Sequence, residues 1–119
     1  MEQNNERSLH LILCHKWFKM IEDGIKNEEY RERTPYWCKR FSQNNCIPSY
    51  QGIQWQCAGI KDKCNAEISF PYTHIVFHDG YTNTIMKKKV ISCTVGVGRR
   101  EWGAPNHSTF IIKFKDCNK

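Results

Sequence analysis

The residues best suited to chemistry stand together in the stretch 24–31, Gly-Ile-Lys-Asn-Glu-Glu-Tyr-Arg. Side chains this densely ionisable rarely fill a hydrophobic core, so they either pair with one another or line a cleft. The guanidinium of Arg31 suits bidentate contact with a phosphate or a base, and the carboxylate of Glu29 suits the amino group of cytosine. Together with the ammonium of Lys26, these groups could bind a nucleotide. A structural network of ion pairs among the same three residues is the alternative, and it stays open.

The conformation of this stretch bears on the choice. In a regular strand Lys26 and Glu29 would face opposite sides, because successive side chains alternate. They converge only if the chain bends between them, or if Lys26 still belongs to the end of a preceding helix.

A second group of candidate residues follows at 96–103, Gly-Val-Gly-Arg-Arg-Glu-Trp-Gly. Its arginines, Arg99 and Arg100, and the indole of Trp102 could form a rim that stacks on bases and binds phosphates. The alternative is a buried tryptophan beside two solvated arginines. The run Lys87-Lys88-Lys89 is typical of a solvated face or a protected edge strand, and it still adds positive charge for a polyanion.

The composition indicates one globular domain, and its net charge favours an anionic partner. Of 119 residues, 39% are hydrophobic and 13% aromatic, enough for a core without metal or disulfide staples. The formal net charge of +6 favours RNA or a nucleoside-type ligand, although many small basic domains bind no anion. We expect a monomer that needs no cofactor.

The expected location follows from what the chain lacks. No apolar run is long enough to cross a membrane, and the polar residues 1–7 do not form a signal peptide. We therefore expect a cytoplasmic protein without a membrane partner, and the nucleus stays open. There the seven cysteines are expected to be thiols, and the absence of a C-x-x-C pair predicts no metal site.

Hydrophobic periodicity predicts the elements that hold these residues. Residues 8–14 alternate as a strand, and residues 16–23 show helical spacing that ends at Gly24. Thr34 and Pro35 are typical of a helix start, which predicts a second short helix over 35–41. Further strands are expected at 73–78, 87–98 and 108–115, with a turn at Asp79-Gly80 and with bulges or a close backbone approach at Gly96 and Gly98.

These elements predict an α+β fold, a small and mostly antiparallel β-barrel with two or more short helices. Residues 8–119 are expected to form a single domain after a disordered tail at 1–7. Residues 42–72 lack periodicity and are expected to form a long loop or insert, with one short strand around 52–56.

Several motifs follow one another in a recognisable order. They are Gly24-x-Lys26-x-x-Glu29-x-Arg31, the strand His74-Ile75-Val76-Phe77 followed by Gly80-Tyr81, then Gly96-x-Gly98, Glu101-Trp102-Gly103 and the final strand Phe110-Ile111-Ile112. Together they resemble the ASCH domain, a member of the PUA-like barrel superfamily, over most of residues 8–115 apart from the insert. The resemblance implies a small barrel with a cleft beside the first motif, and a module that binds RNA. We expect the RNA or nucleoside to contact Lys26, Glu29, Arg31, Arg99, Arg100, Trp102 and Tyr81.

The resemblance also implies an enzymatic alternative. One branch resembles small amidohydrolases that act on N4-acetylcytidine with a lysine, a threonine and a glutamate, and another member is described as a ribonuclease. These roles fall on Lys26, on Glu29 in place of the threonine, and on Glu101. A carboxylate cannot replace a threonine nucleophile without changing the chemistry. The hypothesis is therefore a binding module first, and second a hydrolase of a modified nucleoside or RNA with Lys26, Glu29 and Glu101 as catalytic residues.

Overall fold

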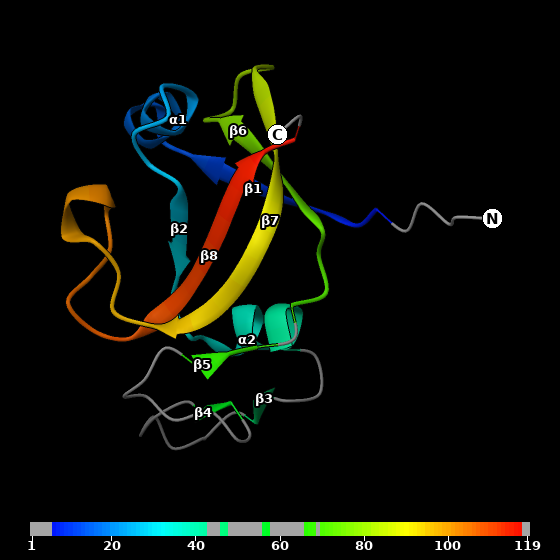
Figure 1. The fold of residues 1–119 in the computed structure, drawn as a ribbon, viewed down its shortest axis with the longest axis vertical. Helices are drawn as coiled ribbons and strands as arrows, with labels where there is room; N and C mark the ends of the chain where they lie inside the picture. Colours follow the sequence, from blue (N-terminus) through cyan, green and yellow to red (C-terminus); the bar gives the residue numbers. More distant parts are fainter. Residues whose placement is uncertain (1–5, 43–45, 48–55, 58–65, 69, 118–119) are drawn as a thin grey trace.

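The fold is built on one curled β-sheet. The computed structural model describes residues 6–42, 46–47, 56–57, 66–68 and 70–117. In this part of the chain the strands of the sheet follow the order β1 (Ser8–Leu13), β6 (His74–Asp79), β7 (Ile85–Gly96), β8 (Thr109–Asp116) and β2 (Glu28–Arg31). Figure 1 shows that the long strands β7 and β8 bend together, so that the sheet curls into a half-barrel. β1 runs parallel to β6, and the other neighbours in this order pair antiparallel.

The predicted α+β class, with a curled sheet and two short helices, is confirmed. The sheet is mixed, however, because β1 runs parallel to β6. A long crossover joins these two strands, which is the kind of connection that parallel neighbours require. The strand order leaves β1 and β2 at the two edges, so the described strands form an open half-barrel.

Three short strands lie in the predicted insert 42–72. β3 (Cys46–Ile47) and β4 (Gln56–Cys57) form a separate two-stranded sheet, and β5 (Ala66–Glu67) pairs with β7. The strand expected around 52–56 lies outside the described residues, except for Gln56 at the start of β4.

The main hydrophobic core fills the inside of the curl. The alternating residues of β1 and β8 are buried there as predicted, and helices α1 (His15–Glu22) and α2 (Pro35–Ser42) contribute to the same cluster. Its strand and helix members include Leu9, Leu11, Leu13, Phe110, Ile112, Phe114, Phe18, Ile21, Cys38 and Phe41. Because both helices pack against this one face, the other face of the sheet is left for the loop that follows β7.

Both helices follow their local signals. Gly24 adopts the left-handed conformation with φ of 79°, as a glycine after a helix end does. The hydroxyl of Thr34 accepts a hydrogen bond from the backbone N–H of Trp37 at 3.4 Å, which caps the start of α2. The first cap matters for function, because it directs the chain from α1 into residues 25–31.

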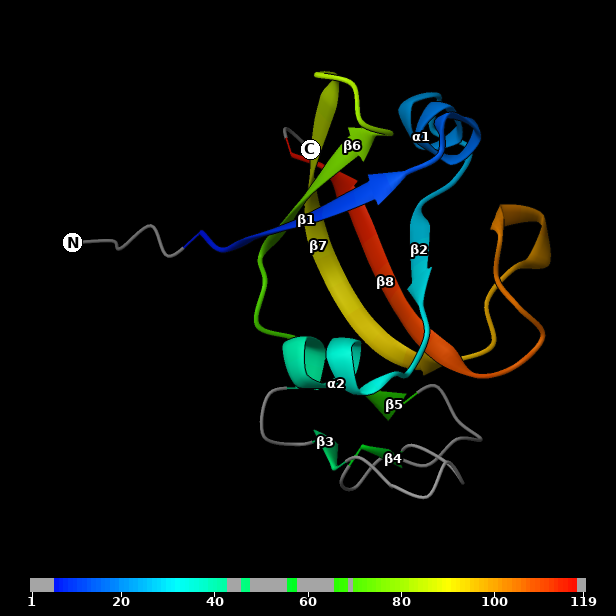
Figure 2. The ribbon, with the colours of Figure 1, turned by 180° about the vertical axis from the view of Figure 1, so that it is seen from behind.

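A smaller cluster covers the outer face of the sheet next to β2. It consists of Tyr30 on β2, Ile111 on β8 and Ala104, with Trp102 packed against them. Trp102 belongs to the 3-10 helix η2 (Arg100–Trp102). Figures 1 and 2 both show this loop, residues 97–108, projecting beside β2 and away from β1 and β6. The 97–108 loop therefore lies next to β2, the strand that contains the charged residues of the stretch 24–31.

The cysteines and the helices bear on two predictions made for the whole chain. Cys38 is disulfide-bonded, so the prediction of a thiol is wrong for this residue, whereas Cys14 and Cys117 are exposed free thiols. The prediction rested on compartment, but a disulfide depends on which cysteines the fold brings within bonding distance. Among the described residues, no helix has the length and apolar character needed to cross a membrane.

Candidate functional site

Lys26 lies at the exit of α1 and not in the strand. β2 begins only at Glu28, and the backbone N–H of Lys26 still donates to the carbonyl of Met20 at 3.1 Å. This placement lets its side chain run along β2 and meet Glu29. Of the two geometries in which Lys26 and Glu29 could converge, the structure therefore contains the helix exit.

The ammonium of Lys26 is enclosed by three acceptors. Its Nζ donates to the backbone carbonyls of Glu28 at 2.6 Å and Trp102 at 2.9 Å, and it lies 3.2 Å from Oε1 of Glu29. The side chain is 1% exposed, with Nζ 4.7 Å from the ring centroid of Tyr30 and 5.4 Å from that of Trp17. The lysine thus joins α1, β2 and the 97–108 loop at one atom.

Glu29 connects Lys26 to Arg31. Its second oxygen accepts from the guanidinium of Arg31, which also donates to the carbonyl of Tyr30 at 2.9 Å. The guanidinium carbon lies 5.5 Å from the ring centroid of Trp37 on α2. Glu29 and Arg31 pair with Ile112 and Phe110 of β8, so they occupy the core side of β2. We call Lys26, Glu29 and Arg31 the buried network.

Burial sets the electrostatics of this network. Removal from water lowers the pKa of Lys26, and the neighbouring carboxylate of Glu29 opposes that effect. The two backbone carbonyls add hydrogen bonds that favour the charged amine. The arrangement is that of a buried ion pair whose polar atoms are satisfied, which is the condition for such a pair to be stable.

The opposite face of β2 carries a second set of contacts. The hydroxyl of Tyr30 donates to Oε1 of Glu28 at 2.8 Å and accepts from the backbone N–H of Arg99 at 3.1 Å. Burial raises the pKa of this hydroxyl well above its ordinary value. A Cβ on Gly98 would come within 2.2 Å of the Tyr30 ring, so the predicted close backbone approach is confirmed at this glycine. The loop is therefore held against β2 by Tyr30 on the outside and by Lys26 on the inside.

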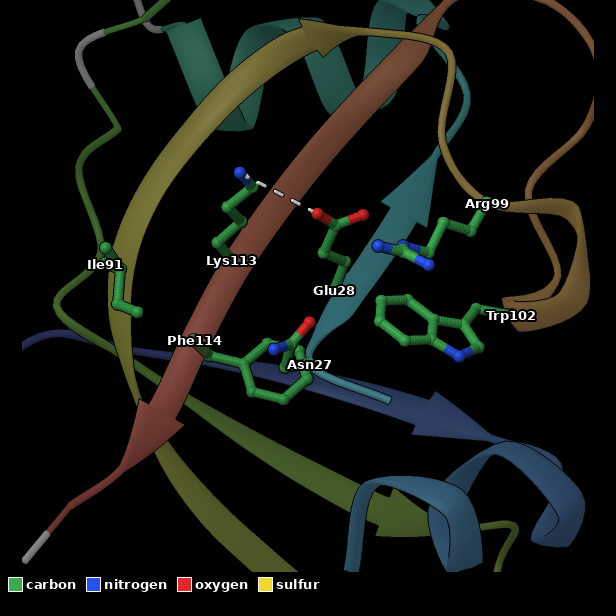
Figure 3. Close-up of a pocket in the computed structure, with 7 residues that line it drawn as sticks. All are labelled: Asn27, Glu28, Ile91, Arg99, Trp102, Lys113 and Phe114. Atoms are coloured by element: carbon green, nitrogen blue, oxygen red, sulfur yellow. Dashed lines mark ion pairs between the residues drawn. The ribbon is translucent and has the colours of Figure 1, made fainter. Parts of the chain in front are cut away.

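A groove opens between this loop and the outer face of the sheet. It has a volume of about 280 Å³ and is shown in Figure 3. A neighbouring cavity of about 270 Å³ shares three of its lining residues, Glu28, Arg99 and Lys113. Each volume is close to the lower end of the range for small-ligand sites, about 300 Å³. The first cavity is lined by Asn27, Glu28, Ile91, Arg99, Trp102, Lys113 and Phe114.

The groove brings together an aromatic platform and opposite charges. The guanidinium of Arg99 lies over the indole of Trp102, 4.7 Å from its ring centroid. Figure 3 shows Glu28 on β2 facing Lys113 on β8, where Oε2 and Nζ are 3.9 Å apart. The carboxylate is partly accessible, with a side chain 15% exposed. A bound group would meet one acceptor, two cations and a flat surface.

The structure brings only some of the predicted site residues to this groove. Arg99 and Trp102 line it, whereas Lys26 and Glu29 lie behind it in the buried network. Arg31 belongs to the same network and its side chain is 19% exposed. The predicted alternatives for Trp102 combine, because the indole both packs on the smaller cluster and lines the groove.

Three other predicted residues stand apart from the buried network. The side chain of Glu101 is 64% exposed and pairs with Arg99 at 3.4 Å. Arg100 is exposed at the start of η2. Tyr81 is 93% exposed in the turn before β7, whereas Arg99 follows the other end of that twelve-residue strand. The structure thus does not gather Glu101 with Lys26 and Glu29.

Four lining residues of the groove were not predicted from the sequence, namely Asn27, Glu28, Ile91 and Lys113. Glu28 had a signal, since in a strand it lies on the same face as Tyr30 and opposite to Glu29. A bulge in β7 between Val90 and Ser92 brings Ile91 to the groove. The glycine pattern had predicted a bulge at the end of this strand instead. Lys113 had no signal, because only the β2–β8 register sets it opposite Glu28.

Within the described residues, no three His, Cys, Asp or Glu side chains gather as ligands for a metal ion. The groove offers hydrogen-bonding, stacking and charged groups. Comparisons of the chain with protein-family models, with curated proteins and with solved structures found no match.

Proposed function

We propose that this chain binds RNA or a nucleoside-type ligand, with one base or nucleotide held in the groove between β2, β8 and the 97–108 loop. The observation that carries this proposal is the stacked pair of Arg99 and Trp102 beside the carboxylate of Glu28 and the ammonium of Lys113. Planar bases stack on aromatic rings or on guanidinium planes, and phosphates attract lysine and arginine. The proposal includes the resemblance to an ASCH domain, and the curled half-barrel of the described strands is consistent with a small barrel-like fold.

Glu28 would select the base. Its carboxylate only accepts hydrogen bonds, and Tyr30 already donates to one of its oxygens. The second oxygen faces Lys113 at a distance longer than a hydrogen bond, and it is available to an exocyclic amine. A carboxylate pairs with the amino group of cytosine, whereas it repels the carbonyl that uracil has in the same place. Cytidine nucleotides are therefore the expected ligands.

The buried network would position the groove without touching the ligand. Lys26 holds the carbonyl of Trp102 on the loop and the carbonyl of Glu28 on β2, the two residues that face each other across the site. This role differs from the direct contact expected from the sequence. It follows from the 1% exposure of Lys26 and from the three acceptors that surround its Nζ.

Calorimetric titration with CMP and UMP at low salt tests the proposal. Wild type should bind CMP more tightly than UMP. Glu28→Gln should weaken CMP binding about fivefold, because exchanging a charged for a neutral acceptor costs about 1 kcal/mol. Trp102→Leu should weaken both nucleotides, since stacking contributes about 1–3 kcal/mol per base.

Glu32→Gln is the matched control for the carboxylate. Glu32 follows β2 directly, is exposed and pairs with His107, but it does not line the groove. Its variant should bind CMP like wild type. Absence of binding to both nucleotides, or equal behaviour of the Glu28 and Glu32 variants, would refute the assignment of the groove.

A second candidate function, hydrolysis of a modified nucleoside or of RNA, is favoured by one observation. Burial lowers the pKa of Lys26, which brings an amine closer to the range of a general base. Against it, Glu101 stands apart and the amine is fully engaged. Incubation with N4-acetylcytidine and with RNA, followed by chromatography, decides: products that disappear in Glu29→Gln support hydrolysis, and unchanged substrates after long exposure exclude it.

A further inference from the structure

Three lysines form a row on the outer face of the sheet. Lys89 of β7 and Lys115 of β8 are directly opposite each other in the register of the two strands. Lys113 lies two residues before Lys115, so it shares the same face of β8. All three are exposed. We call Lys89, Lys113 and Lys115 the lysine row.

The lysine row carries charge that its surroundings do not balance. Like charges on directly opposite strand positions destabilise a sheet, yet Lys89 and Lys115 face one another. Neither forms an ion pair with any described residue, whereas the adjacent Lys87 pairs with Glu6 and Lys88 pairs with Asp116. Among the described residues, the one ion pair of the row is that of Lys113 with Glu28, at 3.9 Å. Such a face is complementary to an external polyanion.

The row begins at the groove and leads away from it. Lys113 lines both cavities of the site, and Figure 3 shows it on β8 beside the groove. Lys115 follows one pleat further along the same strand, about 7 Å away, and Lys89 flanks it across the β7–β8 pair. The positive charge therefore continues beyond the space that one nucleotide fills.

We propose that the lysine row is the track for the phosphate backbone of a single-stranded nucleic acid, one base of which occupies the groove. This inference rests on the proposed function, and it narrows the ligand from a nucleotide to a polynucleotide. A flexible single strand can place one base between Glu28 and Trp102 while its neighbouring phosphates follow β8. A duplex keeps its bases stacked inside and cannot fill the groove.

Fluorescence anisotropy with a labelled cytidylate dodecamer, beside calorimetry with CMP, tests the row. The test variant is Lys89→Gln with Lys115→Gln. Each phosphate contact to a single strand contributes about 0.7 to the slope of log affinity against log salt. The variant lacks two such contacts. Raising the salt from 50 to 200 mM should therefore reduce the ratio of wild-type to variant affinity for the dodecamer about sevenfold. CMP affinity should stay unchanged, and Lys89→Arg with Lys115→Arg should restore dodecamer binding.

The matched control is Lys16→Gln with Lys39→Gln, which removes the same charge from the two helices. Both lysines are exposed, and α1 and α2 pack on the opposite, core side of the sheet. Dodecamer binding that falls equally in test and control variants would overturn the inference, as would equal binding of a duplex of the same length. If CMP binds but the lysine variants leave dodecamer binding unchanged, the row fails and the groove stands. If neither CMP nor the dodecamer binds, the proposed function itself fails.

Discussion

Replacing Lys26 by methionine tests whether the buried network is structural. Methionine keeps most of the apolar stem but removes the ammonium that contacts Glu29 and the carbonyls of Glu28 and Trp102. Glu29, which is 6% exposed, would then keep Arg31 as its one charged partner among the described residues. Removing one member of a buried pair costs about 3–5 kcal/mol, because the other charge is left uncompensated.

That loss is large for a domain of this size. Total stabilities are about 5–15 kcal/mol, so the variant would lose between a fifth and all of it. For 119 residues the unfolding entropy is about 0.25 kcal/mol per degree, which converts the loss into a fall in Tm of about 12–20 °C. Thermal unfolding followed by circular dichroism, with urea titrations for the free energy, measures both quantities.

Two further variants isolate the ion pair. Lys26→Met with Glu29→Gln removes both charges while the amide still accepts from Arg31, so it should be more stable than the sum of the single losses predicts, by about 1–3 kcal/mol. Lys19→Met changes an exposed lysine that pairs with Glu22 and Asp23, and it should stay within about 0.5 kcal/mol of wild type.

The refuting result is equally specific. If Lys26→Met lost less than about 1 kcal/mol of stability and yet abolished CMP binding, the ammonium would be acting on a ligand and not on the fold. The positioning role inferred for Lys26 would then be wrong, and direct recognition by Lys26 and Glu29, the first interpretation of the sequence, would take its place.

Other predictions concern the contacts that hold the loop and the second helix. Because the folded state keeps the Tyr30 proton above the ordinary pKa of 10.0 while the unfolded state releases it, the free energy of unfolding should fall as pH rises above 10. Tyr30→Phe should show a smaller fall in urea titrations at high pH. Gly98→Ala should cost about 1–3 kcal/mol by forcing a methyl group into the Tyr30 ring, whereas the exposed Val97→Ala should be neutral. Thr34→Ala should cost about 1 kcal/mol in thermal unfolding through the lost cap of α2, and unchanged stability would show that the 3.4 Å contact is too weak to count.

The elements with strong local signals were predicted well. The alternation at 8–14 and 108–115 corresponds to β1 and β8, and the threonine–proline pair begins α2. These features depend on neighbours in sequence, through the pleat of a strand and the hydrogen bonds at a helix start. The bulge in β7 was misplaced, because a bulge depends on the strand that pairs with it.

The candidate site was predicted in part for the same reason. The stretch 24–31 and the 97–108 loop do meet, and the chain order showed both as chemically rich. Which face of β2 would be covered was not visible, however, because the period of a strand defines two faces and does not say which one packs inside. Glu29 and Arg31 went to the core side, and Glu28 went to the groove.

The sequence by itself determined that Glu28 and Tyr30 lie opposite to Glu29 and Arg31 once this stretch is a strand, and that a glycine ends α1 just before it. Only the tertiary structure decided that Lys26 stays at the helix exit and reaches the carbonyl of Trp102, a residue seventy-six positions later. Only the register of β2 on β8 set Glu28 against Lys113, and that of β7 on β8 set Lys89 against Lys115. The physical reason is that local conformation is coded by near neighbours, whereas pairing across a sheet is selected by the burial of the whole face.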